Sequence, residues 1–191
     1  VAIIAIIAAI AIPGLVRARI SANEGSAVGT LRTLSTSQSQ FQSQAQVDQD
    51  QDGAGEYGIL GELAGVKSRR GNASNTSGLI PANPSFITSV LAPSGQNHAG
   101  KSGYNFQIYM PGTAAGSCTT DDGVTDSPIT YLTSTNQAVI DVQETQFRAY
   151  GWPVSYRTTG IRCFAVDQAG EVLAAPNVNG TEAYYEGTTN A

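Results

Sequence analysis

Residues 1–13 read VAIIAIIAAIAIP, an uncharged apolar run that ends at Pro13. The run is too short to span a bilayer, which takes about 20 apolar residues. It is also too apolar to lie bare on the surface of a soluble domain, because water disfavours exposed apolar area. The segment therefore needs an apolar partner, and this requirement constrains the fold and function of the whole chain.

The apolar run continues into a long helical pattern. Steps of three, four and seven place one apolar stripe on a helix; its members are Leu15, Val16, Ile20, Ala27, Leu31, Leu34, Phe41 and Ala45. The pattern extends to about Val47, where DQDQDG (48–53) ends it. A helix of about 46 residues is roughly 70 Å long. Its second half can lie on a sheet, whereas its first half needs a membrane or neighbouring copies of the chain.

Pro13 interrupts this helical pattern. Proline lacks the backbone N–H that helix hydrogen bonding uses, and its ring clashes with the preceding turn. Gly14 follows directly and lowers helix stability further. The pair predicts a kink or a melted turn near Pro13.

The remaining sequence predicts a small antiparallel sheet after an irregular connection. Residues 48–103 are rich in Gly, Ser and Asn, with a short helix expected at 58–64. Alternating patterns predict strands at 104–110, 147–154, 161–166 and 171–175, and 136–145 favours a helix over a strand. The tetrapeptide DQAG (167–170) predicts a tight hairpin turn. The expected fold class is α+β, a long amino-terminal helix packed on a small antiparallel sheet. Residues 1–22 form a hydrophobic transmembrane or polymerisation spine, 23–47 the amphipathic second half of the helix, and 48–191 a globular head with a carboxy-terminal tail.

Composition and charge indicate an exported protein that does not bind nucleic acid. The net charge is −5 and only 13% of residues are charged, which argues against a general nucleic-acid binder, because such a protein needs a basic face for phosphates. Local basic spots occur at Arg69–Arg70 and at Arg17 and Arg19. The two cysteines, Cys118 and Cys163, fit one disulfide in an oxidising compartment. The alternative is two unpaired buried thiols.

The acidic turn after the helix is a candidate metal site. Asp48, Asp50 and Asp52 occupy positions 1, 3 and 5, with Gly53 at position 6, like the first half of a calcium-binding loop. Glu56 falls at position 9, and the bidentate carboxylate of position 12 is missing. The simpler interpretation is a solvated acidic turn that ends the helix. The chain requires no cofactor, and calcium is the one candidate ion.

Two glycine-rich motifs match nucleotide-binding patterns by letter only. Residues 95–102 fit G-x-x-x-x-G-K-S, but a β-alternating run follows them where a P-loop needs a helix. Residues 53–58 fit G-x-G-x-x-G, but they follow carboxylates in place of an apolar strand. His98 is the only histidine and has no nucleophile motif beside it. We predict that the protein is not an enzyme.

The stretch VAIIAIIAAIAIPGLVRARISANE (1–24) resembles the amino-terminal spine of type IV pilins and of type II secretion pseudopilins. KSGYNFQIYM (101–110) and TGIRCFAVDQAGEVLAA (159–175) resemble the first and last strands of bacterial pilin-like proteins, and DQDGAGEYGILGEL (50–63) resembles the segment after their helix. The resemblance implies that the mature chain begins about nine residues before Val1 with an N-methylated aromatic residue, which brings the apolar run to roughly 21 residues, enough to span a membrane. It also implies that the spine polymerises through Val1, Ile3, Ile4, Ile6, Ile7, Ile10, Ile12 and Pro13.

The expected function is that of a major pilin-like subunit, which polymerises with identical subunits into an extracellular type IV pilus-like filament, or fimbrium, on the bacterial cell surface. Its partners before assembly are the inner membrane, which holds the precursor, and the pilus or secretion assembly machinery. The nearest alternative is a major pseudopilin of a type II secretion system. A monomeric membrane-anchored binding protein is a third alternative.

Overall fold

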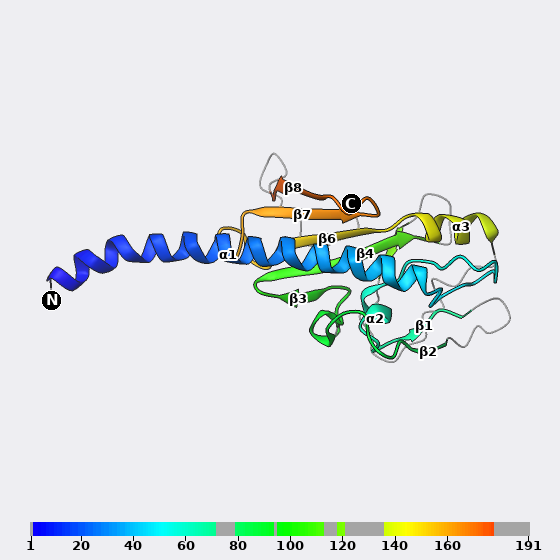
Figure 1. The fold of residues 1–191 in the computed structure, drawn as a ribbon. Coiled ribbons are helices and arrows are strands. Elements are labelled where there is room, and N and C mark those ends of the chain that lie inside the picture. Colours follow the sequence, from blue (N-terminus) through cyan, green and yellow to red (C-terminus); the bar gives the residue numbers. More distant parts are fainter. Residues whose placement is uncertain (1, 72–78, 94, 113–117, 121–135, 178–191) are drawn as a thin grey trace.

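A 42-residue helix, α1 (Ala2–Ser43), runs along the molecule in the computed structural model, and its first half projects beyond the head (Figure 1). The structure describes residues 2–71, 79–93, 95–112, 118–120 and 136–177. The predicted helix is confirmed, although it ends at Ser43, a turn before Val47. Within the described parts of the chain, no helix has both the length and the apolar character needed to cross a membrane.

The helix continues through Pro13, so the predicted melted turn is wrong for this structure. Pro13 removes one hydrogen bond from the ladder, and the turns on either side keep theirs. The axis of α1 curves in its amino-terminal part (Figure 1).

The head is built on one antiparallel sheet with the order β3-β4-β6-β7-β8, and β5 pairs with β4 at the edge beside β3. These strands are β3 (Ala99–Lys101), β4 (Tyr104–Pro111), β5 (Cys118–Thr120), β6 (Arg148–Pro153), β7 (Arg162–Asp167) and β8 (Val172–Pro176). The smaller elements are α2 (Leu60–Leu63), β1 (Ser68–Arg69), β2 (Leu79–Pro81), the 3-10 helix η1 (Ser89–Leu91) and α3 (Gln137–Thr145). The predicted α+β class is confirmed, and so are the four predicted strands and both short helices.

The second half of α1 lies across the sheet and supplies one side of the core (Figure 1). Its buried stripe, Ala27, Leu31, Leu34 and Phe41, faces buried side chains of the central strands; those are Tyr104, Phe106, Ile108, Met110, Ala149, Phe164 and Val166. The stripe predicted from sequence is thus confirmed from Ile20 to Phe41, and Leu15, Val16 and Ala45 are exposed.

Two glycines meet special backbone requirements of this fold: Gly160 allows a close approach in the core, and Gly170 allows the turn between β7 and β8. A side chain at Gly160 would overlap the Tyr104 hydroxyl oxygen, since an ideal Cβ would lie 2.1 Å from it. Gly170 has a φ of 75° in the β7–β8 turn, where its N–H bonds the carbonyl of Asp167. The hairpin predicted at 167–170 is confirmed.

The predicted disulfide between Cys118 and Cys163 is wrong in this structure, because Cys163 is a free cysteine. The register explains why. Cys118 lies opposite Pro111 at one end of β4, whereas Cys163 lies beyond β6 at the level of Asn105. The two positions are separated by three strand spacings and by six residues along the strands, roughly 20 Å in the strand direction alone. A disulfide needs Cα atoms within about 7 Å.

Candidate functional site

The projecting half of α1, residues 2–19, is the most unusual surface of the molecule. Its large apolar side chains are exposed, Ile10 to 75%; the set is Ile3, Ile4, Ile7, Ile10, Ile12, Leu15 and Val16. Val1 and the side chain of Ile6 lie outside the described part of the chain. At 1.5 Å per residue the projecting half is about 27 Å long. An apolar helix surface of this extent ordinarily lies in a protein core, a membrane or an interface.

Glu24 fixes the point where α1 meets the head, a role that the sequence analysis did not predict. Its Oε1 accepts hydrogen bonds from the backbone N–H groups of Ile161 (3.1 Å) and Arg162 (3.3 Å). Its Oε2 pairs with the Arg162 guanidinium, with 2.9 Å to Nε and 2.6 Å to Nη2. The preceding residue, Asn23, donates a hydrogen bond from its Nδ2 to the carbonyl of Thr159 at 2.9 Å. The helix is therefore locked to the β6–β7 connection just where it leaves the head.

Replacing Glu24 with Ala should destabilise the head by about 1–3 kcal/mol, since two backbone donors lose their acceptor. Burial acts to raise the pKa of Glu24, but the hydrogen bonds and charge of Arg162 and the N–H of Ile161 outweigh it and lower the pKa. The contribution of Glu24 is therefore fully present above the ordinary glutamate pKa and is lost as pH falls below it. Unfolding in urea from pH 7 to pH 3, followed by Trp152 fluorescence, should show this acid-dependent loss in the wild type. A Glu24→Ala variant with the wild-type acid profile would contradict the assignment.

The acidic turn brings together three of the four predicted calcium ligands. Carboxylate oxygens of Asp48, Asp50 and Asp52 lie within 4.8 Å of one another. Glu56 departs from the prediction, because its carboxylate is buried and accepts a hydrogen bond from Gln49 N at 2.9 Å. The calcium site stays a prediction.

Two further carboxylates join this turn from α3, and sequence reasoning missed them. Oxygens of Asp141 and Glu144 lie within 4.8 Å of an oxygen of Asp50. Gln137 donates to both Asp50 and Asp141 and so ties α3 to the turn. A helical spacing of three puts Asp141 and Glu144 on one face of α3, but no local signal places that face against residues 48–52.

Crowding of like charges at this end should make stability depend on pH near neutrality. Burial first, and then the charges of Asp52, Asp50, Glu56 and Asp141, raise the pKa of Glu144 to about 7. Because the folded state holds this proton more tightly than the unfolded chain, stability should fall as pH rises from about 4.5 to 7. We expect Glu144→Gln to remove this decline and to raise the urea midpoint at pH 8. Equal midpoints for the two proteins at pH 5 and at pH 8 would contradict it.

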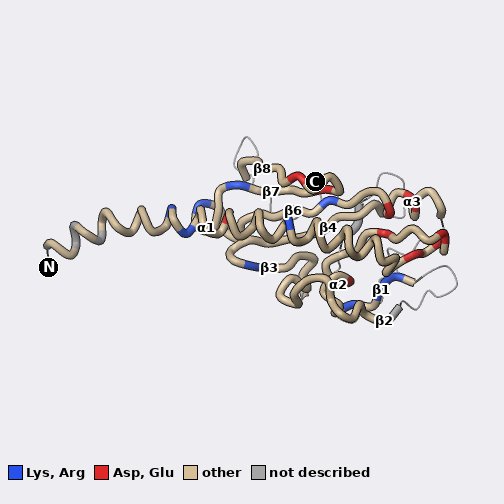
Figure 2. Tube along the Cα trace, viewed as in Figure 1, with Lys and Arg blue, Asp and Glu red and all other residues tan. Residues whose placement is uncertain are grey.

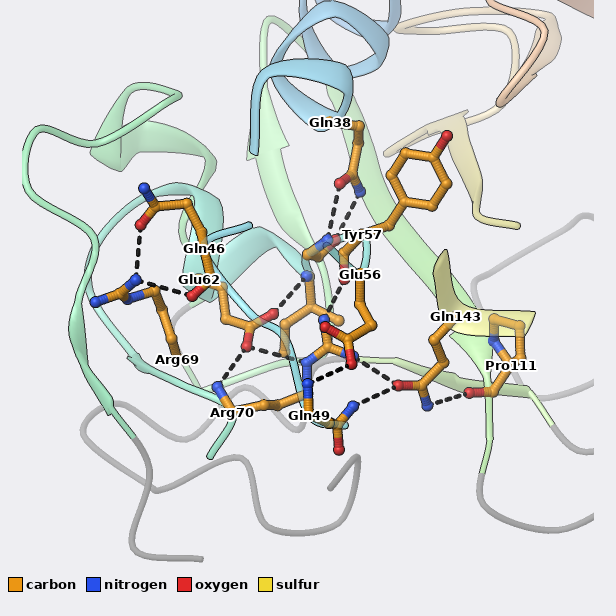
Figure 3. A network of polar contacts seen from close by, with 12 residues as sticks. Gln38, Gln46, Gln49, Glu56, Tyr57, Glu62, Arg69, Arg70, Pro111 and Gln143 are labelled. Carbon is orange, nitrogen blue, oxygen red and sulfur yellow. Dashed lines mark hydrogen bonds and ion pairs between the residues drawn. The ribbon is translucent and has the colours of Figure 1, made fainter. Parts of the chain in front are cut away.

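A buried polar network holds the segment after α1 in place (Figure 3). Arg70, which is 1% exposed, pairs with Glu62 Oε1 at 3.2 Å and donates to Gln143 Oε1 at 2.8 Å and to the carbonyl of Tyr57. Glu62 Oε1 also accepts from Arg70 N, and Oε2 accepts from Ile59 N. Gln38 of α1 exchanges hydrogen bonds with the backbone of Gly58. The network therefore connects α1, α2 and α3 through side chains that water does not reach.

The two glycine-rich motifs and His98 have structural roles in the head. Within residues 95–102, Ala99–Lys101 forms β3, and no helix follows. The His98 ring packs edge-on against Trp152, with ring centroids 5.4 Å apart, and burial lowers its pKa. Gly55 lies against α1, where a Cβ would come 2.3 Å from the carbonyl oxygen of Gln42. Packing against α1 therefore explains why residue 55 of this motif is a glycine.

No protein-family model matches this chain, and neither the curated proteins nor the solved structures contain a significant match. The resemblance to type IV pilins thus stays a prediction from the residues quoted above.

Proposed function

We propose that this protein is a structural subunit that polymerises into an extracellular filament of the type IV pilus kind. The observation that carries the proposal is the exposed apolar surface of the projecting half of α1, which the head does not cover. In the filament these half-helices bundle in the centre, and the heads lie outside. The role is non-enzymatic, and the contacts between subunits need no cofactor.

The energetics of the exposed side chains support assembly. Burying one large aliphatic side chain is worth about 1.5–3 kcal/mol, and the projecting half exposes seven such side chains. The freedom of motion that subunits lose on association reduces this favourable free energy. Because every copy in a bundle both contributes and receives such contacts, we expect the net free energy of assembly to remain favourable. Each contact joins different surfaces of two copies, and such contacts give an open helical filament when their rotation does not close a ring. Before assembly, the same surface would hold the precursor in the inner membrane.

The firm junction between helix and head also supports a filament subunit. The Glu24–Arg162 pair and the Asn23–Thr159 bond fix the direction in which the projecting half leaves the head. A helical polymer repeats one geometry between successive copies, and a fixed helix direction allows that repetition. Tension applied to a head would pass to the helix through these contacts.

The test is assembly of the full chain in a bacterial host that supplies a pilus assembly machinery. We expect filaments many subunits long on the cell surface, with the heads accessible to antibody along their length. Short periplasmic assemblies would favour the pseudopilin of a type II secretion system. A chain that stays monomeric in the membrane would overturn the proposal.

A further inference from the structure

Basic residues gather where α1 leaves the head (Figure 2). The basic neck is defined as Arg17, Arg19, Lys101, Arg157 and Arg162. Arg17 and Arg19 are exposed on α1, and within the described residues no salt bridge involves either of them.

Contacts with Asn23 and Glu24 bring two of the other three cations to the same end, and a hydrogen bond at Gly103 brings the third. Arg157 lies in the β6–β7 connection that Asn23 binds at Thr159, and Arg162 is the partner of Glu24. Lys101 ends β3 just before Gly103, whose carbonyl accepts from Val154 N at 3.0 Å. Glu24 is the one acid among the described residues of this region, and Arg162 already pairs with it.

Acidic residues gather at the opposite end of the head (Figure 2). The acidic end consists of Asp48, Asp50, Asp52, Asp141 and Glu144. Their oxygens form two overlapping groups within 4.8 Å, so the carboxylates repel one another at close range. The nearby Arg69 directs its guanidinium to the carbonyl and the side chain of Gln46. A cationic surface placed against this end would relieve the repulsion.

The two charged ends cannot neutralise each other within one molecule. From Arg19 to the end of α1 at Ser43 the helix rises about 36 Å, several times the screening length of about 8 Å at physiological ionic strength. The helix runs straight along the head between them (Figure 1). Any protein group that pairs with the exposed charges of the neck or of the acidic end across this distance therefore belongs to another molecule. A second copy of this chain supplies partners for both.

We propose that the acidic end of one head docks against the basic neck of the next copy along the filament. This inference rests on the proposed function, and it names the contact that orders the heads outside the helical bundle. The contact is head-to-tail, so it can repeat along an open helical filament. It also leaves the projecting half of the upper copy beside the lower head, where it can enter the central bundle. Opposite charges at the two faces favour parallel stacking and disfavour antiparallel stacking, in which like charges would meet.

The experiment is a charge swap in the full chain, purified in mild detergent and diluted into buffers of increasing salt. Arg17→Glu/Arg19→Glu and Asp52→Lys/Asp141→Lys should each raise the critical concentration for filaments by about tenfold or more at low salt. The four substitutions combined should restore assembly to near the wild-type level, because the pairing returns with opposite polarity. The matched control is Arg32→Glu, a reversal at an exposed position in the middle of the same helix; we expect it to leave the critical concentration within about twofold. Trp152 fluorescence confirms that each head is folded.

The outcomes separate this inference from the proposed function. If the wild type forms filaments and neither reversal changes the critical concentration or its salt dependence, the docking contact is wrong and the function stands. If the wild type forms no filaments, the proposed function itself fails. If Arg17→Glu/Arg19→Glu abolishes binding to vesicles of anionic phospholipid but leaves assembly unchanged, the basic neck faces a membrane and the proposed docking is refuted. Failure of the combined variant to recover assembly, with all heads folded, would also refute the pairing.

Discussion

Replacing Ile10 with Asp is expected to abolish filament formation while the head still folds. Among the described side chains of the projecting half of α1, Ile10 is the most exposed large apolar one, at 75%. In a bundle of apolar helices, its replacement would bury a carboxylate with no cation beside it. An unpaired buried charge costs several kcal/mol, and every copy in the polymer would incur that cost. Electron microscopy and sedimentation of the purified chain measure the loss.

Ile10→Leu is the matched control, because it keeps the volume and the apolar character of the side chain. We expect it to assemble like the wild type. The head of the Asp variant should unfold in urea at the wild-type midpoint, since none of the described side chains of residues 2–19 belongs to the core. Normal filaments from Ile10→Asp would show that the projecting half is not the polymerisation surface.

Local patterns in the sequence predicted most of the fold. Period-two alternation fixed the strand at 104–110, where Tyr104, Phe106 and Ile108 are buried. The helical stripe from Ile20 to Phe41 predicted the face that packs on the sheet. Both patterns are formed by residues of a single helix or strand, so they can be recognised without knowing which element packs against it. The same is true of the hairpin at Gly170, whose positive φ is a local requirement.

The polar contacts were not predictable because their partners lie far apart in the chain. Glu24 meets Arg162, and Asp50 meets Asp141, only after the sheet and α3 are in place. A single buried carboxylate leaves no period in the sequence, unlike a hydrophobic stripe. Cysteine number alone likewise predicted a bond between Cys118 and Cys163. Strand register instead places Cys118, in β5, beside the last residue of β4, and places Cys163 near the start of β7, at the opposite end of the sheet. The number of cysteines indicates an oxidising compartment, but it does not indicate how far apart the two cysteines lie in the fold.

Replacing Arg70 with Met is expected to destabilise the head by about 3–5 kcal/mol, the cost of leaving a buried charge without its partner. Glu62 would keep its carboxylate at zero side-chain exposure, and Gln143 and the carbonyl of Tyr57 would lose a donor. Globular domains have only about 5–15 kcal/mol in total, so the loss is a large share of stability. Urea unfolding followed by the fluorescence of Trp152, which is 2% exposed, measures it.

Arg69→Met is the matched control, because Arg69 directly precedes Arg70 and ends β1. Arg69 is half-buried and donates to the carbonyl and side chain of Gln46, so its loss should cost about 0.5–1.5 kcal/mol. A double-mutant cycle with Glu62→Gln isolates the ion pair, because removing the charge of Glu62 makes the loss of Arg70 less costly. The double variant should therefore be more stable than the sum of the two single losses predicts. If the losses simply add, or if Arg70→Met costs no more than Arg69→Met, the network is not what holds residues 56–70 between α1 and α3.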